Sequence, residues 1–323
     1  MFNFVRNRRN FYAISLLVMI PGLISLVLPG GLRPGIDFTS GTLMTIRFEQ
    51  PVDQQELRDA FATLGHGEAV VQRSGDNTFV VRSRPFAQAQ QGDTPESVQV
   101  SERQTVQDAL AGRFGPTEIL NLDQVSATIA EEIVRYAVVA VAVASAFILF
   151  YLAWAFRKVQ FPWRYGSTAV IALVHDAVVV LGVFSILGRV FPIELEATFI
   201  VAVLTVIGFS VHDTIVVFDR IRENFIRHQG ESLEDVVNHS LMQTIGRSLN
   251  TSLTVILTLT VLLLFGGVTI RTFVLALLVG ITTGTYSSIF VASMLLVSWH
   301  NGEIERLFFW RRSRSPALPA AAA

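Results

Sequence analysis

The sequence of 323 residues contains no cysteine, so disulfides, cysteine zinc sites and thiol catalysis are excluded. It also has little charge: 16% of the residues are charged, whereas 51% are hydrophobic. A soluble domain of this size needs more charge to cover its surface. With a mean hydropathy of +0.50, the composition indicates a polytopic α-helical membrane protein. The net charge of −1 gives no information about nucleic-acid binding. We expect no nucleic-acid partner.

Several motifs of known chemistry are also missing. The chain has no Walker loop, no Rossmann glycine fingerprint and no Gly-x-Ser-x-Gly elbow. The acids inside its apolar runs do not follow the Gly-x-Gly-Asp pattern of intramembrane aspartyl proteases. We therefore expect no enzymatic activity, no cofactor and no metal site.

Six apolar runs have the length of about 20 residues that a helix needs to cross ~30 Å of hydrocarbon. They lie at 11–29, 134–156, 167–190, 197–218, 249–268 and 272–297. The first follows the basic segment 1–10, and we interpret it as a retained span rather than a signal peptide. The sequence therefore predicts six transmembrane helices.

The arginines that flank these runs predict the orientation of the chain. They gather in every second segment between the runs, and arginine is enriched on the cytoplasmic side of membrane proteins. This places the termini, 1–10 and 298–323, and the segment 219–247 in the cytoplasm. Within 219–247, an amphipathic helix from Leu233 to Ile245 is expected to lie along the membrane surface or against the ends of the spans. We expect the end of the C-terminal tail to be disordered.

The segment 32–130 has soluble composition and is then exported, between helices 1 and 2. Its patterns predict a βαββαβ order, which fits a ferredoxin-like α+β domain. The elements are strand 42–48, helix 51–64, strands 69–72 and 78–81 around the turn 74–77, a loop at 85–96, helix 97–114 and strand 117–122. No cluster of His, Asp or Glu stands out there, so a docking or recognition role is expected.

Asp213 is the most unusual residue, because it is an acid inside an apolar span. It could be a structural partner of a basic group, a metal ligand, a protease carboxylate or a group that titrates. Low dielectric disfavours the charged form of a carboxyl group, as a proton carrier requires. From the residues alone, a permanently paired aspartate and a proton site both remain open.

Arg247 is a candidate partner for Asp213. It begins a stripe of polar residues at helical spacing that continues with Asn250, Thr251, Thr254 and Thr258. The stripe could form an interior seam that pairs with Asp213 and conducts water or protons. Alternatively, Arg247 is a cytoplasmic flanking residue and the threonines bond their own helix.

Two other features lie in the spans. His175 and Asp176 repeat the Val-His-Asp sequence of His212 and Asp213, and could form a relay with it or simply bond a neighbouring helix. Gly280 and Gly284 have the small-xxx-small spacing of close helix contacts. We interpret this pair as a packing feature.

These residues resemble those of a known family. The run 211–224, from Val-His-Asp-Thr to Arg-Glu-Asn, resembles the fourth-span signature of the SecF family, the smaller half of the bacterial SecD–SecF export complex. Segments 35–42, 172–176, 248–257 and 284–290 resemble other parts of that family. Two positions differ: His212 stands where the family usually has Asn, and Ser40 where it usually has Gly.

The resemblance implies a six-span subunit of the resistance-nodulation-division type in the bacterial inner membrane. It implies an obligate partner, SecD, action on the SecYEG channel and an unfolded preprotein, and use of the proton motive force. In that family the acid at the position of Asp213 and the arginine at the position of Arg247 are functionally important. A non-titrating scaffold and half of a proton-driven small-molecule exporter remain alternatives.

Overall fold

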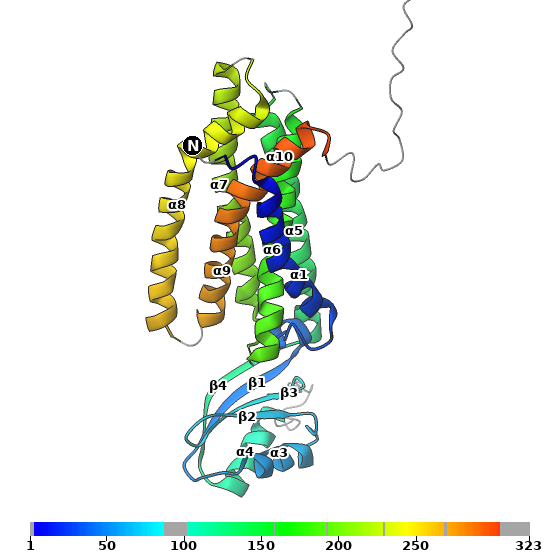
Figure 1. The fold of residues 1–323 in the computed structure, drawn as a ribbon. Helices are drawn as coiled ribbons and strands as arrows, with labels where there is room; N and C mark the ends of the chain where they lie inside the picture. The colour runs from blue at the N-terminus through cyan, green and yellow to red at the C-terminus, as the bar shows by residue number, and fades with distance from the viewer. Residues whose placement is uncertain are drawn as a thin grey trace, which may run out of the picture. The chain divides into compact units, whose positions relative to one another are not determined.

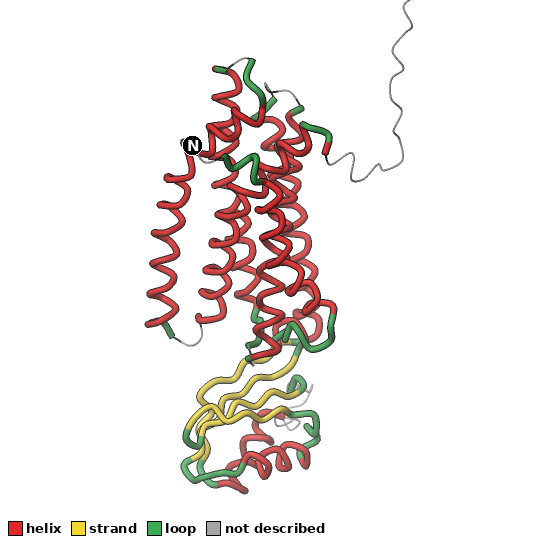
Figure 2. Tube along the Cα trace, in the orientation of Figure 1, coloured by secondary structure: helices red, strands yellow, loops and turns green. Residues whose placement is uncertain are grey.

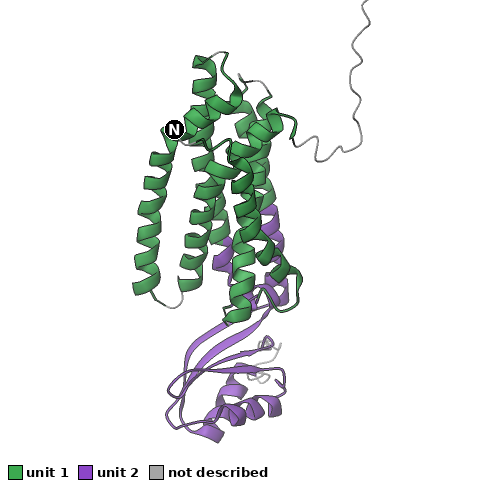
Figure 3. Ribbon diagram, in the orientation of Figure 1, with its two compact units in different colours: residues 1–32, 141–193, 201–323 green, residues 33–140, 194–200 purple. Residues whose placement is uncertain are grey.

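The computed structural model describes residues 3–86, 102–157, 159, 161–191, 193–228, 230–267 and 270–303. The chain divides into two compact units. Unit 1 holds 1–32, 141–193 and 201–323, and unit 2 holds 33–140 and 194–200 (Figure 3). Most of the predicted loop 85–96 and almost all of the C-terminal tail lie outside the described residues.

Six helical segments in the described chain are long and apolar enough to cross a membrane, as the sequence predicts. The last one contains a π-helical turn, η2, between two α-helices. They are α1 (Arg8–Val27), α5 (Ala127–Ala155), α6 (Pro162–Val190), α7 (Ala197–Arg227), α8 (Leu233–Phe265), and the series α9 (Arg271–Ser287), η2 (Ser288–Ala292) and α10 (Ser293–His300) (Figure 1).

The expectation of a separate amphipathic helix at 233–245 is wrong, because α8 is continuous from Leu233 to Phe265. Its start is fixed by Ser232, whose hydroxyl accepts a hydrogen bond from the Asp235 amide at 3.2 Å. Its first turns still use the predicted apolar face, which joins a buried cluster with Phe218 and Ile221 of α7. Gly246 does not break the helix, since a single glycine costs only about 1 kcal/mol there.

In unit 1, α1 and α6 approach each other through glycines. A Cβ atom on Gly182 would lie 2.7 Å from the Cα atom of Gly22. Beyond this point the Ser25 and Ser185 hydroxyls are 2.8 Å apart. The Arg189 guanidinium donates to the carbonyls of Ser25 and Leu28, at 3.0 and 2.6 Å. It thus satisfies carbonyls that the end of a helix leaves without partners.

Unit 2 contains the α+β domain. Its four strands form one antiparallel sheet in the order β2-β3-β1-β4, which is the predicted split βαβ arrangement. Helices α3 and α4 lie together beside the sheet (Figure 2). After a short α2 (Ile36–Thr39), the elements are β1 (Gly41–Phe48), α3 (Gln54–Thr63), β2 (Val70–Gly75), β3 (Thr78–Ser83), α4 (Glu102–Phe114) and β4 (Thr117–Val125).

The core of this domain follows the alternation of its strands. Met44, Ile46 and Phe48 of β1 point to the same side and are buried. Leu57 and Phe61 of α3 are fully buried against that layer. Every second residue of a strand therefore faces the helices, as the sequence pattern indicates.

The glycine contact between α1 and α6 predicts a selective effect of one methyl group. Gly182→Ala should lower the melting temperature in detergent, because overpacking a tight contact costs about 1–3 kcal/mol. Gly208→Ala in α7 is the matched control, since no atom lies within 4 Å of its added Cβ. Equal melting temperatures for the two variants would contradict the assigned contact.

Candidate functional site

Asp213 lies on α7 with only 4% of its surface exposed. Its Oδ2 atom is buried and has no hydrogen-bond partner among the described residues. The Ser248 hydroxyl of α8 is also buried and has no hydrogen-bond partner among the described residues. His212, the preceding residue, is exposed because it lies on another face of α7. The structure therefore separates the two titratable groups that are adjacent in sequence.

Asp176, on α6, is fully buried, but its carboxylate is well supplied with partners. Its Oδ2 atom accepts hydrogen bonds from the hydroxyls of Ser210 on α7 and Ser287 on α9, both at 2.7 Å. Its Oδ1 atom lies 3.1 Å from Nδ1 of His175. Three helices thus meet at one carboxylate, which links them.

The small residues of α9 allow this helix to approach α7 closely. A Cβ atom on Gly280 would lie 2.2 Å from the Val206 side chain, and one on Gly284 would lie 3.0 Å from Cβ of Ser210. Alanine would therefore push α9 away from α7. The two glycines set the distance at which Ser287 reaches Asp176.

The π-helical turn η2 follows directly. The Ser288 hydroxyl donates to the Ser210 carbonyl at 3.0 Å and lies 2.9 Å from the hydroxyl of Thr214. Thr214 follows Asp213 in the chain, so Ser288 contacts the turn of α7 that carries this acid. Single π-turns inside α-helices occur frequently at functional sites.

The predicted polar seam does not face the interior of this chain. Arg247, Asn250, Thr251, Thr254 and Thr258 are all exposed. No ion pair joins Asp213 to Arg247 in the described structure, so the expected pairing within the chain is not found. The three threonines donate to carbonyls of their own helix instead.

Another stripe of α8 faces inward. Thr244, Ser248 and Ser252 repeat every four residues and are buried. Ser252 accepts a hydrogen bond from Thr285 of α9 at 2.6 Å. Sequence reasoning missed this stripe, although its i, i+4 spacing is visible in the chain. Both stripes are polar, so the pattern alone does not show which one is buried.

A second connection, which we call the clasp, joins residues 33–37 to residues 194–197 inside unit 2. The Gly35 amide donates to the Leu195 carbonyl at 2.7 Å, and the Leu195 amide donates to the Arg33 carbonyl at 2.8 Å. The Asp37 carboxylate accepts from the Ala197 amide at 2.6 Å, the first amide of α7. Asp37 therefore caps α7 from a distant part of the sequence.

Charged side chains lie at the clasp. Arg82 of β3 forms an ion pair with Glu194, the residue before Leu195. Burial raises the pKa of the Glu196 carboxyl, and the neighbouring charges of Asp37 and Asp123 raise it further. Protonation of Glu196 relieves this repulsion, so its contribution to folding is present at low pH and is lost as pH rises through the raised pKa.

No metal centre is evident among the described residues. Within the ranges that the structure describes, no group of three or more His, Cys, Asp or Glu side chains could hold a metal ion. The arrangement offers carboxyl, hydroxyl and imidazole groups inside a helix bundle. Such groups form hydrogen bonds between helices, and carboxyl and imidazole groups are the ones among them that exchange protons.

Comparisons with known proteins show which family the chain resembles. Residues 105–302 match the family described as "Protein export membrane protein SecD/SecF, C-terminal", and residues 30–52 match the "SecD/SecF GG Motif". The second match contains one arm of the clasp, residues 33–37. The first contains all of α5 to α10 with Asp176, Asp213 and Arg247.

Full-length relatives are similar over nearly the whole chain. "Protein translocase subunit SecF" of Thermobaculum terrenum is 52% identical over 95% of this chain and 97% of its own length. The protein of the same name from Anaerolinea thermophila is 40% identical over 98% of this chain and 99% of its own. A crystal structure of SecDF from Thermus, described as a translocon-associated membrane protein, is 36% identical with a TM-score of 0.74. The match covers 93% of this chain and 39% of that longer chain.

The clasp predicts a sharp requirement at Gly35. A Cβ atom there would lie 2.5 Å from the Leu195 carbonyl oxygen, so Gly35→Ala should separate the two arms. Amide hydrogen exchange at Leu195 and Ala197 should then become faster. Gly67→Ala in the same unit is the control, because no atom lies within 4 Å of its added Cβ. Unchanged exchange in Gly35→Ala would show that the arms do not depend on this approach.

Proposed function

The chain belongs to the SecF family of protein translocase subunits, and we propose that it acts with SecD as an accessory unit of the Sec translocase. In this proposal the pair uses the proton motive force to promote preprotein movement through SecYEG and release outside the bacterial inner membrane. Both termini are cytoplasmic, and the α+β domain is exported. The protein performs transport work without making or breaking a covalent bond.

The observation that carries the proposal is the contrast between the two buried acids. Asp176 accepts two hydroxyl hydrogen bonds and has His175 beside it. Asp213 keeps a buried oxygen without a hydrogen-bond partner in the described residues. A buried carboxylate without a partner is costly, so an acid in that position favours its neutral form and becomes charged only where a partner or water reaches it. Asp213 is therefore the acid whose charge depends on conditions, whereas Asp176 holds the helices together.

Arg247 completes the proposed switch at the surface of the subunit. An arginine and a line of polar side chains on the outer face of a membrane helix require a covering protein, because hydrocarbon does not solvate them. We assign SecD as that cover. The two side chains are not paired in the described structure. In the proposal, release of the proton leaves a negative charge on Asp213 that draws Arg247 towards it, and uptake of the proton removes the attraction. The spans of the two subunits then shift relative to each other.

The clasp supplies a path from this switch to the exported domain. Residues 194–200, which include the first turn of α7, belong to the same compact unit as the α+β domain. Movement of α7 is thereby passed to the domain that would meet the preprotein. One charge moved across 100 mV represents about 2.3 kcal/mol, which is enough to shift a balanced two-state equilibrium by more than tenfold.

The exposed His212 has a secondary place in this proposal. Its imidazole lies outside the interior cluster, on the surface of α7. We assign His175 to the structural cluster instead, because its Nδ1 atom lies against Asp176.

The proposal predicts a specific effect of Asp213→Asn. In vesicles that contain SecD, this variant should export preprotein at the rate that the wild type shows without a proton gradient, because an amide does not exchange the proton. Arg247→Met should behave in the same way. The measurement is the protected fraction of a preprotein with and without an uncoupler.

Asp219→Asn is the matched control, since Asp219 is an exposed acid on the same helix, paired with Arg222 at 2.7 Å. It should keep the response to the gradient. A normal response in Asp213→Asn, together with loss of export when the whole subunit is removed, would favour a non-titrating scaffold instead.

A further inference from the structure

A cavity of about 560 Å³ lies away from the two buried acids, between the end of α5 and the last turns of α7. One wall is formed by Trp154 and Arg157, and the other by Arg222, Glu223, Ile226 and Arg227. The proposed function gives this cavity no role. Its size is within the range of about 300–1,000 Å³ that is usual for small-molecule sites.

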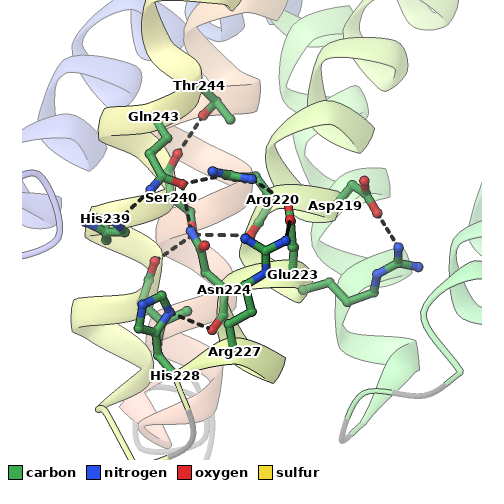
Figure 4. A network of polar contacts seen from close by, with 12 residues as sticks. Asp219, Arg220, Glu223, Asn224, Arg227, His228, His239, Ser240, Gln243 and Thr244 are labelled. Atoms are coloured by element: carbon green, nitrogen blue, oxygen red, sulfur yellow. Dashed lines mark hydrogen bonds and ion pairs between the residues drawn. The ribbon is translucent and has the colours of Figure 1, made fainter.

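The lining has an excess of positive charge. It contains three arginines and one glutamate, and the glutamate is already engaged. Glu223 lies between Arg220 and Arg227 and forms ion pairs with both (Figure 4). Asp219 pairs with Arg222. With Arg220, which does not line the cavity, the group contains four arginines and two acids. Two positive charges therefore remain without a compensating acid in the described structure.

Arg157 is the arginine most available to a ligand. It is exposed, and it forms no ion pair with any described residue. Its guanidinium lies 4.8 Å from the centre of the Trp154 ring, an arrangement that orients the group without neutralising it. Arg222 is held in a similar way, 5.6 Å from the Phe156 ring, and donates to the Ala155 carbonyl at 3.4 Å.

Apolar side chains lie beside these charges. Trp154 is 63% exposed and Ile226 is 53% exposed, although both are large and hydrophobic. The cavity also lies where the apolar parts of two membrane helices end, at Ala155 and Phe218. Tryptophan is enriched at such membrane boundaries. The lining thus combines a site for an anion with a surface for hydrocarbon.

We propose that this cavity binds the headgroup of an anionic phospholipid. The phosphate would lie against Arg157 and Arg222, and an acyl chain against Trp154 and Ile226. A soluble phosphate would use the arginines but leave the two apolar side chains exposed. Basic pockets between membrane helices bind anionic headgroups by the same chemistry. The inference goes beyond the proposed transport function and does not depend on it.

Native mass spectrometry of the chain purified with SecD tests the proposal. The complex is incubated with phosphatidylglycerol or phosphatidylcholine, and the retained lipid is counted. Wild type should retain phosphatidylglycerol preferentially. Arg157→Gln should weaken this binding by about fivefold, the effect of roughly one charge near an anionic headgroup. Arg157→Lys should keep most of it.

Arg164→Gln is the matched control. Arg164 is also stacked on an aromatic ring, 4.3 Å from the centre of Phe161, but it does not line this cavity. It should retain lipid as the wild type does. A thermal melt of each variant establishes that it is folded.

Several results would overturn the proposal. Equal retention of the two lipids, or equal loss in Arg157→Gln and Arg164→Gln, would show that the cavity has no headgroup specificity. Displacement of the lipid by inorganic phosphate at equal concentration would indicate a free-anion site. Unchanged lipid binding in Arg157→Gln together with loss of an acidic protein partner would indicate a protein-docking site.

Discussion

Two carboxyl groups lie inside the helix bundle, and the low dielectric there requires each to be hydrogen-bonded, paired or neutral. Asp176 meets the requirement within the chain, through Ser210, Ser287 and His175. Asp213 does not, since its Oδ2 atom has no partner among the described residues. In the proposed mechanism, this difference divides the site into a fixed part and a part whose charge changes.

The fixed part depends on close contact between α7 and α9. Gly280 and Gly284 leave no room for a side chain against Val206 and Ser210. The hydroxyls of Ser287 and Ser288 then reach Asp176 and the Ser210 carbonyl. This cluster fixes α7 one turn before Asp213. The clasp at the other end makes the first turn of that helix part of the α+β unit.

Much of this arrangement could be predicted from the sequence. The six spans and the βαββαβ order follow from hydrophobic periodicity, and Asp213 stands out in the sequence because charge is costly in an apolar run. The inward face of α8 could not be predicted, because polar residues at helical spacing occupy two faces, one with Arg247 and one with Ser248. The clasp could not be predicted from the sequence either. Two of its hydrogen bonds join backbone atoms, and Asp37 caps a helix 160 positions away.

Infrared difference spectroscopy of the complex with SecD tests the central claim most directly. The carboxyl C=O band of Asp213 is assigned by its loss in Asp213→Asn and is then followed as pH is changed. The account predicts that this band appears and disappears reversibly over the pH range measured. An Asp213 carboxylate that remained ionised over the whole range would contradict the account and would indicate a permanent ion pair.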